Sequence, residues 1–233
     1  MHFDSPLLAG HLIRRYKRFL ADITLDNGQQ VTAHCPNPGS MRACQAPGWP
    51  VRLSVSTDPR RKLPYTLEML HNGASWIGIN TLRTNAVVAE ALRLGQLPEL
   101  AGYTRIQPEV RYAEHSRVDF LLSAPEQPDC YLEVKHVSLR LEQACAFPDA
   151  VSTRALKHIG DLLSMRARGA RAVLLFAVQR DDTHFFRAAH EIDLAYATAL
   201  HAAVGQGLEI LVRRVAVSPE ALVLAEALPF QGD

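Results

Sequence analysis

The chain has 233 residues, of which 48% are hydrophobic and 21% are charged. This composition is that of a folded protein with one large or two modest domains, and it excludes wholesale disorder. The formal net charge of +1 excludes a histone-like polycation. The charge is unevenly distributed, because residues 1–82 hold nine Lys and Arg against five Asp and Glu, whereas residues 83–233 hold 16 against 19.

The chain has the features of a cytoplasmic protein. Its first ten residues lack the cationic start and apolar run of a signal peptide, and no apolar stretch approaches the ~20 residues that cross a bilayer. The four cysteines form no CxxC pair and are too sparse for a disulfide scaffold. We therefore expect reduced thiols and no contact with a membrane, and the oligomeric state is left open.

Residues 1–82 read as short strands separated by turns, which predicts a small OB-like β-barrel. The clearest signal is a hairpin of Ile23–Leu25 and Gln29–Ala33, because the Asn-Gly pair between them tolerates the positive φ of a tight turn. A basic and apolar segment, Leu12–Leu20, precedes this hairpin. Further strand candidates are Val51–Ser56, Tyr65–Leu70 and Trp76–Ile79.

Residues 83–233 change to a mixed pattern, which predicts a second domain of order α-β-β-β-α-β-α-β. Its first helix, Ala86–Leu94, is expected to be capped by Thr84 or Asn85 and ended by Gly95. A longer helix runs from Ser152 or Thr153 to Gly169, with an apolar face of Val151, Ala155, Leu156, Ile159, Leu162 and Leu163. The other expected elements are the helix Leu194–Val204 and the strands Thr104–Tyr112, Arg117–Leu122, Cys130–Leu139, Ala172–Val178, Leu208–Val212 and Ala221–Leu224.

Candidate catalytic residues lie in two neighbouring strands of this second domain. Asp119 is in the middle of one strand, and Glu133 and Lys135 share a face of the next because residues two apart in a strand point the same way. A hairpin would bring the two carboxylates together, where a hard cation such as Mg²⁺ or Mn²⁺ relieves their repulsion. A lysine beside the cation can orient water or stabilise charge on a phosphate. The competing interpretation is a solvated strand face.

The order of elements resembles the core of the PD-(D/E)xK nuclease-like superfamily, although Val118 stands where the motif name has proline. The likeness implies a set of metal ligands, which are Asp119, Glu133, Val134 and, from the first helix, Glu90. Glu109, in the following strand, is a further candidate for an acidic metal ligand. For both Glu90 and Glu109, a plain surface glutamate is the alternative.

Longer motifs make the chain similar to one family. They are RRYKRFL at 14–20, HCPNPGSM at 34–41, RKL at 61–63, GINT at 78–81, SRVDF at 116–120, EVK at 133–135, FPDA at 147–150 and KH at 157–158. These motifs resemble the sugar fermentation stimulation protein family (SfsA), with Pro38 and His136 in place of the usual Thr and Asn. The resemblance implies an N-terminal OB-like domain, a nuclease-like C-terminal domain, DNA binding and an association with the regulation of sugar (maltose) metabolism.

Three groups of cations are candidates for contacts with nucleic acid. They are Arg14, Arg15, Lys17 and Arg18 around Tyr16; Arg60, Arg61 and Lys62 in a predicted loop; and Arg154 and Lys157 on the polar face of the long helix. Cations interleaved with aromatic rings suit contacts to phosphates and bases. The competing interpretations are a solvated strand edge, an exposed loop tip and an ion pair between Lys157 and Asp161.

The sequence therefore predicts a protein that binds single- or double-stranded DNA without sequence specificity and carries a nuclease-like Mg²⁺ site. One alternative is an active Mg²⁺-dependent nuclease. A second is a carbohydrate- or metabolite-sensing OB module in which Trp49 and Trp76 stack on sugars. His34 and Cys35 are expected to belong to a structural turn, because no further zinc ligands stand at suitable spacing.

Overall fold

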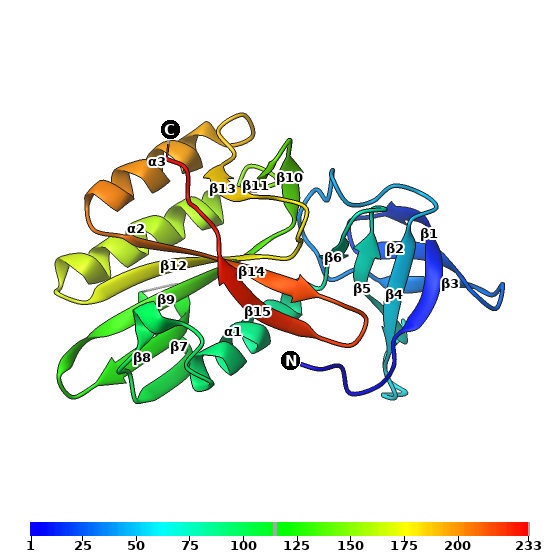
Figure 1. The fold of residues 1–233 in the computed structure, drawn as a ribbon, viewed down its shortest axis with the longest axis horizontal. Coiled ribbons are helices and arrows are strands. Elements are labelled where there is room, and N and C mark those ends of the chain that lie inside the picture. Colours follow the sequence, from blue (N-terminus) through cyan, green and yellow to red (C-terminus); the bar gives the residue numbers. More distant parts are fainter. Residues whose placement is uncertain (114–115, 233) are drawn as a thin grey trace.

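The computed structural model describes residues 1–113 and 116–232, which form a barrel joined to a layered α/β domain (Figure 1). The barrel strands are β1 (Leu8–Tyr16), β2 (Leu20–Leu25), β3 (Gln30–His34), β4 (Pro50–Val55), β5 (Tyr65–His71) and β6 (Trp76–Gly78). They follow the order β3-β2-β1-β4-β5-β6, and a parallel pairing of His34 with Thr66 joins β3 to β5. This pairing closes β1–β5 into the OB-like barrel that the sequence predicted.

Alternating burial and one tight turn shape the barrel. In β2, Ala21, Ile23 and Leu25 are buried while the residues between them are only half-buried. Gly28 has a φ of +86° in the hairpin between β2 and β3, as expected of the Asn-Gly pair. The inward side chains form a hydrophobic core that belongs to the barrel alone.

The second domain is built around a six-stranded sheet of order β15-β14-β12-β9-β8-β7. Its elements are η1 (Thr81–Arg83), α1 (Thr84–Arg93), η2 (Pro98–Leu100), β7 (Arg105–Ala113), β8 (Ser116–Ala124), β9 (Gln127–Val137), β10 (Leu139–Leu141), β11 (Ala144–Phe147), α2 (Thr153–Ala167), β12 (Arg171–Val178), β13 (Phe185–Ala188), α3 (Leu194–Gly205), β14 (Glu209–Val217) and β15 (Leu222–Ala227). Helix α1 covers one face of the sheet, and α2 and α3 cover the other (Figure 1). The predicted α-β-β-β-α-β order and the mixed α/β class are confirmed. Within the described residues, no helix is long and apolar enough to cross a membrane.

The start of α1 differs from the prediction. Thr84 is the first residue of the helix, and neither Thr84 nor Asn85 caps it. The 3₁₀ turn η1 leads directly into the helix, and Asn80 caps that turn by accepting a hydrogen bond from the Leu82 N–H at 3.1 Å. The Thr84 hydroxyl is therefore free to bond to His136 Nδ1 on β9, at 2.9 Å.

The start of α2 follows the prediction, but its buried face does not. The Ser152 side chain caps the helix by accepting a hydrogen bond from the Ala155 N–H at 3.1 Å. Val151 precedes the helix and is 73% exposed, whereas His158 is buried on the face assigned to apolar residues. The short strands β10, β11 and β13 were not predicted, because runs of three or four residues are too short to show alternation.

Polar contacts dock a barrel loop onto the second domain. The Ser40 hydroxyl donates to the carbonyl of Asp149 at 2.7 Å, and the Met41 N–H donates to the Asp149 carboxylate at 3.2 Å. A Cβ on Gly39 would lie 2.2 Å from Asp149 Oδ2, so a side chain has no room there. The two hydrogen bonds hold the loop of residues 36–41, which we call the docking loop, against the second domain.

Candidate metal and nucleic-acid site

Two adjacent strands bring the predicted catalytic trio together. The antiparallel register of β8 and β9 sets Asp119 beside Glu133. Asp119 Oδ2 accepts a hydrogen bond from the Val134 N–H at 2.7 Å. Glu133 is only 3% exposed, and Lys135 Nζ reaches its Oε1 at 2.7 Å. The three functional groups therefore meet at one place on the sheet.

The Asp119 carboxylate is harder to ionise than an ordinary aspartate. Burial and the charge of Glu133 raise its pKa to about 6, against the opposing effect of hydrogen bonds from the Val134 N–H and the Asn85 side chain. The Asn85 contact comes from α1 and measures 2.8 Å. A positive charge beside Asp119 would favour its ionised form.

Two basic groups hold Glu133 in its ionised form. Burial opposes the charge, but the hydrogen bond with His158 and the charge of Lys135 outweigh it and lower the pKa of Glu133 below its usual value. His158 Nδ1 contacts Glu133 Oε1 and lies 3.3 Å from Lys135 Nζ. The three side chains form one network, so each restricts the position of the other two.

The carboxylate pair fits a hard divalent cation. Glu133 Oε2 is buried without a hydrogen-bond partner among the described residues, while Oε1 takes both basic contacts. Such an orphaned oxygen is costly, and a cation shared with Asp119 would satisfy it. Val134 can offer only its carbonyl, because its N–H is bound to Asp119. In the part of the chain that is described, no three His, Cys, Asp or Glu side chains gather as metal ligands, so water would complete the shell.

Glu90 does not join this pair. Its carboxylate accepts a hydrogen bond from the ammonium group of Met1. The α1 side chain that reaches Asp119 is Asn85, and residues five apart on a helix point in different directions. The expectation that Glu90 is a metal ligand is therefore corrected by its position. Glu109, the other acidic candidate, does line the cavity that contains Asp119.

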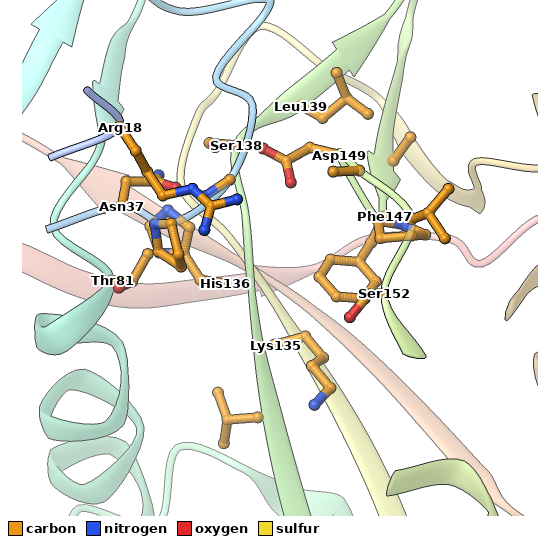
Figure 2. Close-up of a pocket in the computed structure, with 17 residues that line it drawn as sticks. Arg18, Asn37, Thr81, Lys135, His136, Ser138, Leu139, Phe147, Asp149 and Ser152 are labelled. Carbon is orange, nitrogen blue, oxygen red and sulfur yellow. The ribbon is translucent and has the colours of Figure 1, made fainter. Parts of the chain in front are cut away.

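Two cavities adjoin the site. The carboxylate cavity, of about 600 Å³, is lined by Glu109, Arg111, Ser116, Arg117, Asp119, Glu133, Arg154, Lys157 and His158. The interdomain cavity, of about 390 Å³, is lined from the barrel by Arg18, Asn37, Pro38 and Gly39 and from the second domain mainly by residues 134–136 and 146–152. Arg18 and Lys135 line the interdomain cavity from different domains, and Figure 2 shows the Lys135 amine pointing away from Arg18. Glu133 and Lys135, two residues apart on β9, thus belong to adjoining cavities.

Comparisons with known proteins agree with this two-domain architecture. The family model described as the SfsA N-terminal OB domain matches residues 13–79, and the sugar fermentation stimulation protein RE domain matches residues 82–221. The chain belongs to the SfsA family. A sugar fermentation stimulation protein homolog of Acidithiobacillus ferrooxidans is 50% identical over 96% of this chain and 97% of its own, and one of Caulobacter vibrioides is 48% identical over 98% and 96%.

A solved structure confirms the fold of the SfsA-family chain. The structure of Pyrococcus furiosus SfsA in complex with Ca²⁺ covers 99% of this chain and 98% of its own, with a TM-score of 0.89 at 24% identity. The barrel and the sheet domain are therefore shared along their whole length.

Two of the predicted cations form an exposed hairpin tip in the SfsA barrel. Lys17 and Arg18 join β1 to β2 with φ values of 46° and 64°, in the left-handed region that residues other than glycine rarely occupy. Both side chains are exposed, and Arg18 lines the interdomain cavity. Among the predicted barrel cations, Arg18 thus shares a cavity with Lys135.

The neighbouring arginines are engaged within the barrel. Arg15 donates to the carbonyls of Asn37 and Gly39, both at 2.9 Å. Arg15 therefore supports the docking loop of residues 36–41, and its role in binding nucleic acid stays a prediction. Arg14 is exposed and donates to Asp22 at 2.9 Å, so it remains at the surface but is paired.

The other two cation groups lie in different places. Arg60, Arg61 and Lys62 are exposed in the loop between β4 and β5 and line neither cavity. Arg154 and Lys157 on α2 both line the carboxylate cavity. Only the α2 group therefore shares a cavity with Asp119 and Glu133.

The sequence predicted no role for three residues of the site. His158 was quoted only within the KH motif, although a polar residue in an apolar stripe is a usable signal. Arg111 and Arg117 line the carboxylate cavity from β7 and β8. Their strands were predicted, but the pairing that joins them across the sheet is not a local property of the sequence.

Two further features are built into the SfsA barrel. Cys35, next to His34 at the end of β3, is buried, and burial raises the pKa of its thiol, as suits a structural turn.

Trp76 packs against the Arg52 guanidinium at 4.8 Å, and Trp49 packs on the barrel core. Both indoles are half-buried and have a partner within the barrel, which weakens the case for a carbohydrate-sensing module.

Proposed function

We propose that this SfsA-family protein is a cytoplasmic DNA-binding protein without sequence specificity, and that Asp119 and Glu133 hold Mg²⁺ or Mn²⁺ beside the bound strand. The observation that carries the proposal is the orphaned, buried Oε2 of Glu133, a residue that lines one cavity together with Asp119 and several cations. Bare carboxylates would repel phosphate, so a module that only binds DNA has no use for this pair. A cation between carboxylates and phosphate turns that repulsion into attraction.

A relative adds independent support for the metal. Pyrococcus furiosus SfsA was solved in complex with Ca²⁺, another hard cation that prefers oxygen ligands. The family name connects these proteins with sugar fermentation. We infer that a regulatory role in sugar metabolism, including maltose, is exerted through DNA binding.

The chain's own residues assign the roles at this site. Asp119, Glu133 and the carbonyl of Val134 would hold the metal, and His158 fixes Glu133 Oε1 so that Oε2 stays available. A bound divalent cation supplies a Lewis acid and a water of lowered pKa. Lys135 Nζ lies 2.7 Å from Glu133 at the edge of the interdomain cavity, where it can orient water or stabilise charge on a phosphate. Phosphodiester cleavage is therefore the second candidate function.

Labelled single- and double-stranded DNA, incubated with the full chain and Mg²⁺, Mn²⁺ or EDTA, tests both candidates. The variants are Glu133→Gln and Lys135→Met, which nearly preserve side-chain size, and Asp129→Asn on the same strand is the control. We expect binding that falls steeply with salt and is strengthened by metal in the parent protein but not in Glu133→Gln.

The outcomes separate the two candidates. Metal-dependent cleavage that both site variants lose makes the protein a nuclease. Salt-sensitive binding without cleavage under any metal leaves a DNA-binding protein on a nuclease scaffold. Absence of both binding and cleavage contradicts both, and binding that is indifferent to salt would point to a neutral ligand such as a carbohydrate.

A further inference from the structure

The carboxylate cavity has a wall of four cations, of which the sequence predicted only Arg154 and Lys157 as contacts to nucleic acid. We call Arg111, Arg117, Arg154 and Lys157 the cationic rim. The rim lies on β7, β8 and α2, and Figure 1 places β7 and β8 at the edge of the main sheet away from the barrel. The interdomain cavity, with Arg18, adjoins the carboxylates on the barrel side. Cations therefore stand on both sides of Asp119 and Glu133.

Two arginines of the rim face each other across a strand pair. The register of β7 and β8 sets Arg111 directly opposite Arg117, and both side chains are exposed. Like charges directly opposite each other destabilise a sheet. A phosphate placed between the two guanidinium groups would be attracted by both.

Helix α2 brings the other two cations to the same cavity. Lys157 is held in place, since its Nζ donates to Asp161 at 3.0 Å and to the Ser116 hydroxyl. Arg117 and Arg154 contrast with it, because within residues 1–113 and 116–232 neither has a hydrogen bond or ion pair. Two guanidinium groups are therefore available to a ligand, and their planar donors suit phosphate oxygens.

The cationic rim is positive, whereas the second domain as a whole has a net negative charge. Residues 83–233 carry an excess of acidic residues, 19 against 16 basic ones. The carboxylate cavity nevertheless gathers four cations around three acidic residues, which are Glu109, Asp119 and Glu133. A divalent cation on Asp119 and Glu133 would leave the cavity strongly positive, which favours a polyanion.

We propose that the cationic rim is a phosphate subsite for the nucleic acid strand, on the side of the carboxylates away from the barrel. The strand then runs from Arg18 at the interdomain cavity, across Asp119 and Glu133, to the rim. This inference rests on the proposed function, since it specifies where the same strand continues. It adds Arg111 and Arg117 as binding residues.

Salt dependence of affinity tests the subsite by counting phosphate contacts. The full chain is titrated with labelled DNA at constant Ca²⁺, between about 50 and 200 mM KCl. We expect the double variant R111Q/R117Q to reduce the slope of log K against log salt by about 1.8 on duplex and about 1.4 on single strands. The control R105Q changes an exposed arginine of the same strand β7 that lies outside the cavity, and should leave the slope unchanged.

The outcomes distinguish this inference from the proposed function. A parent protein that binds with a steep slope, together with an unchanged slope in R111Q/R117Q, overturns the rim and leaves the proposed function standing. A parent protein without salt-dependent binding overturns both. Should the double variant fail to fold, R154Q on α2 serves instead, with an expected reduction of about 0.9 on duplex, and an unchanged slope in R154Q overturns the rim.

Discussion

Asp119 and Glu133 are neighbours with different proton affinities, and this difference originates in their separate partners. Glu133 has Lys135 and His158 beside it, and its pKa is lowered despite burial. Asp119 has only neutral donors, and burial together with the charge of Glu133 raises its pKa to about 6. Without a metal, the cost of ionising the pair therefore falls mainly on Asp119. A bound cation would lower this cost most strongly at Asp119.

We expect Asp119→Asn to stabilise the metal-free protein at pH 8. Because the pKa of Asp119 is raised on folding to about 6, its favourable contribution is complete below the unfolded value of about 3.9 and is lost as pH rises through 6. The neutral Asn avoids this loss, so the variant should gain about 1–3 kcal/mol at pH 8 and little at pH 4. Urea unfolding in EDTA at both pH values measures the difference.

The exposed Asp129 of β9 provides the matched control, and Asp129→Asn should show no such pH-dependent gain. Equal effects of Asp119→Asn at pH 8 and pH 4 would show that Asp119 carries no raised pKa. Addition of Ca²⁺ at pH 8 should make the parent protein more stable than Asp119→Asn, because only the parent protein retains both carboxylates.

His158→Ala should destabilise the protein by removing a partner of a buried charge. Glu133 would keep only Lys135, and a lost hydrogen bond to a charged group costs about 1.5–3 kcal/mol. Ser164→Ala, an exposed change on the same helix, should stay within about 0.5 kcal/mol. Denaturant unfolding at neutral pH measures both, and equal effects of the two substitutions would argue against the His158–Glu133 contact.

At the scale of elements, α2 carries much of the site, because Arg154, Lys157 and His158 lie within its first two turns. Its position depends on Ser152, whose side chain accepts a hydrogen bond from the Ala155 N–H at 3.1 Å.

Ser152→Ala should lower the free energy of unfolding by about 1 kcal/mol through the lost cap. It should also weaken DNA binding, since the same turn orients Arg154. Thermal unfolding and a binding titration measure the two effects, and an unchanged melting temperature would rule out the cap.

Local signals explain which elements the sequence could predict. The Asn-Gly turn before β3, the Ser152 cap and the continuous apolar run of β12 each depend on a few adjacent residues, and each was found. The ExK spacing likewise placed Glu133 and Lys135 on one face. The Arg111–Arg117 pair depends on strand register, and Glu90 depends on a contact with a residue 89 positions away. Such long-range geometry has no local signature.

At the scale of the whole molecule, the docking of the barrel decides whether Arg18 and Lys135 face one cavity. The docking loop approaches the second domain so closely that Gly39 has no room for a side chain beside Asp149. The Met41 N–H and the Ser40 hydroxyl then bond to Asp149. A substitution at Gly39 should therefore act on the relation between the domains rather than on either core.

We expect Gly39→Ala to loosen the two domains. The new Cβ would lie 2.2 Å from Asp149 Oδ2, so the Asp149 carboxylate must leave its contact with the Met41 N–H or the loop must move, at a cost of about 1–3 kcal/mol. Calorimetry should show a broadened or divided unfolding transition, and DNA affinity should fall because Arg18 and Lys135 no longer line one cavity. Gly205→Ala is the control, since its added Cβ meets nothing within 4 Å.

A second substitution tests whether the collision itself is the cause. Asp149→Ala removes the carboxylate that the new Cβ would strike, although it also removes the acceptor of the Met41 N–H. In the Gly39→Ala background, Asp149→Ala should restore part of the unfolding cooperativity and of the DNA affinity. The losses in the double variant should therefore be smaller than the sum of the losses in the two single variants. Strictly additive losses would mean that Gly39 acts elsewhere. Rescue would establish that the spacing between this loop and Asp149 sets the geometry of the interdomain cavity that Arg18 and Lys135 line.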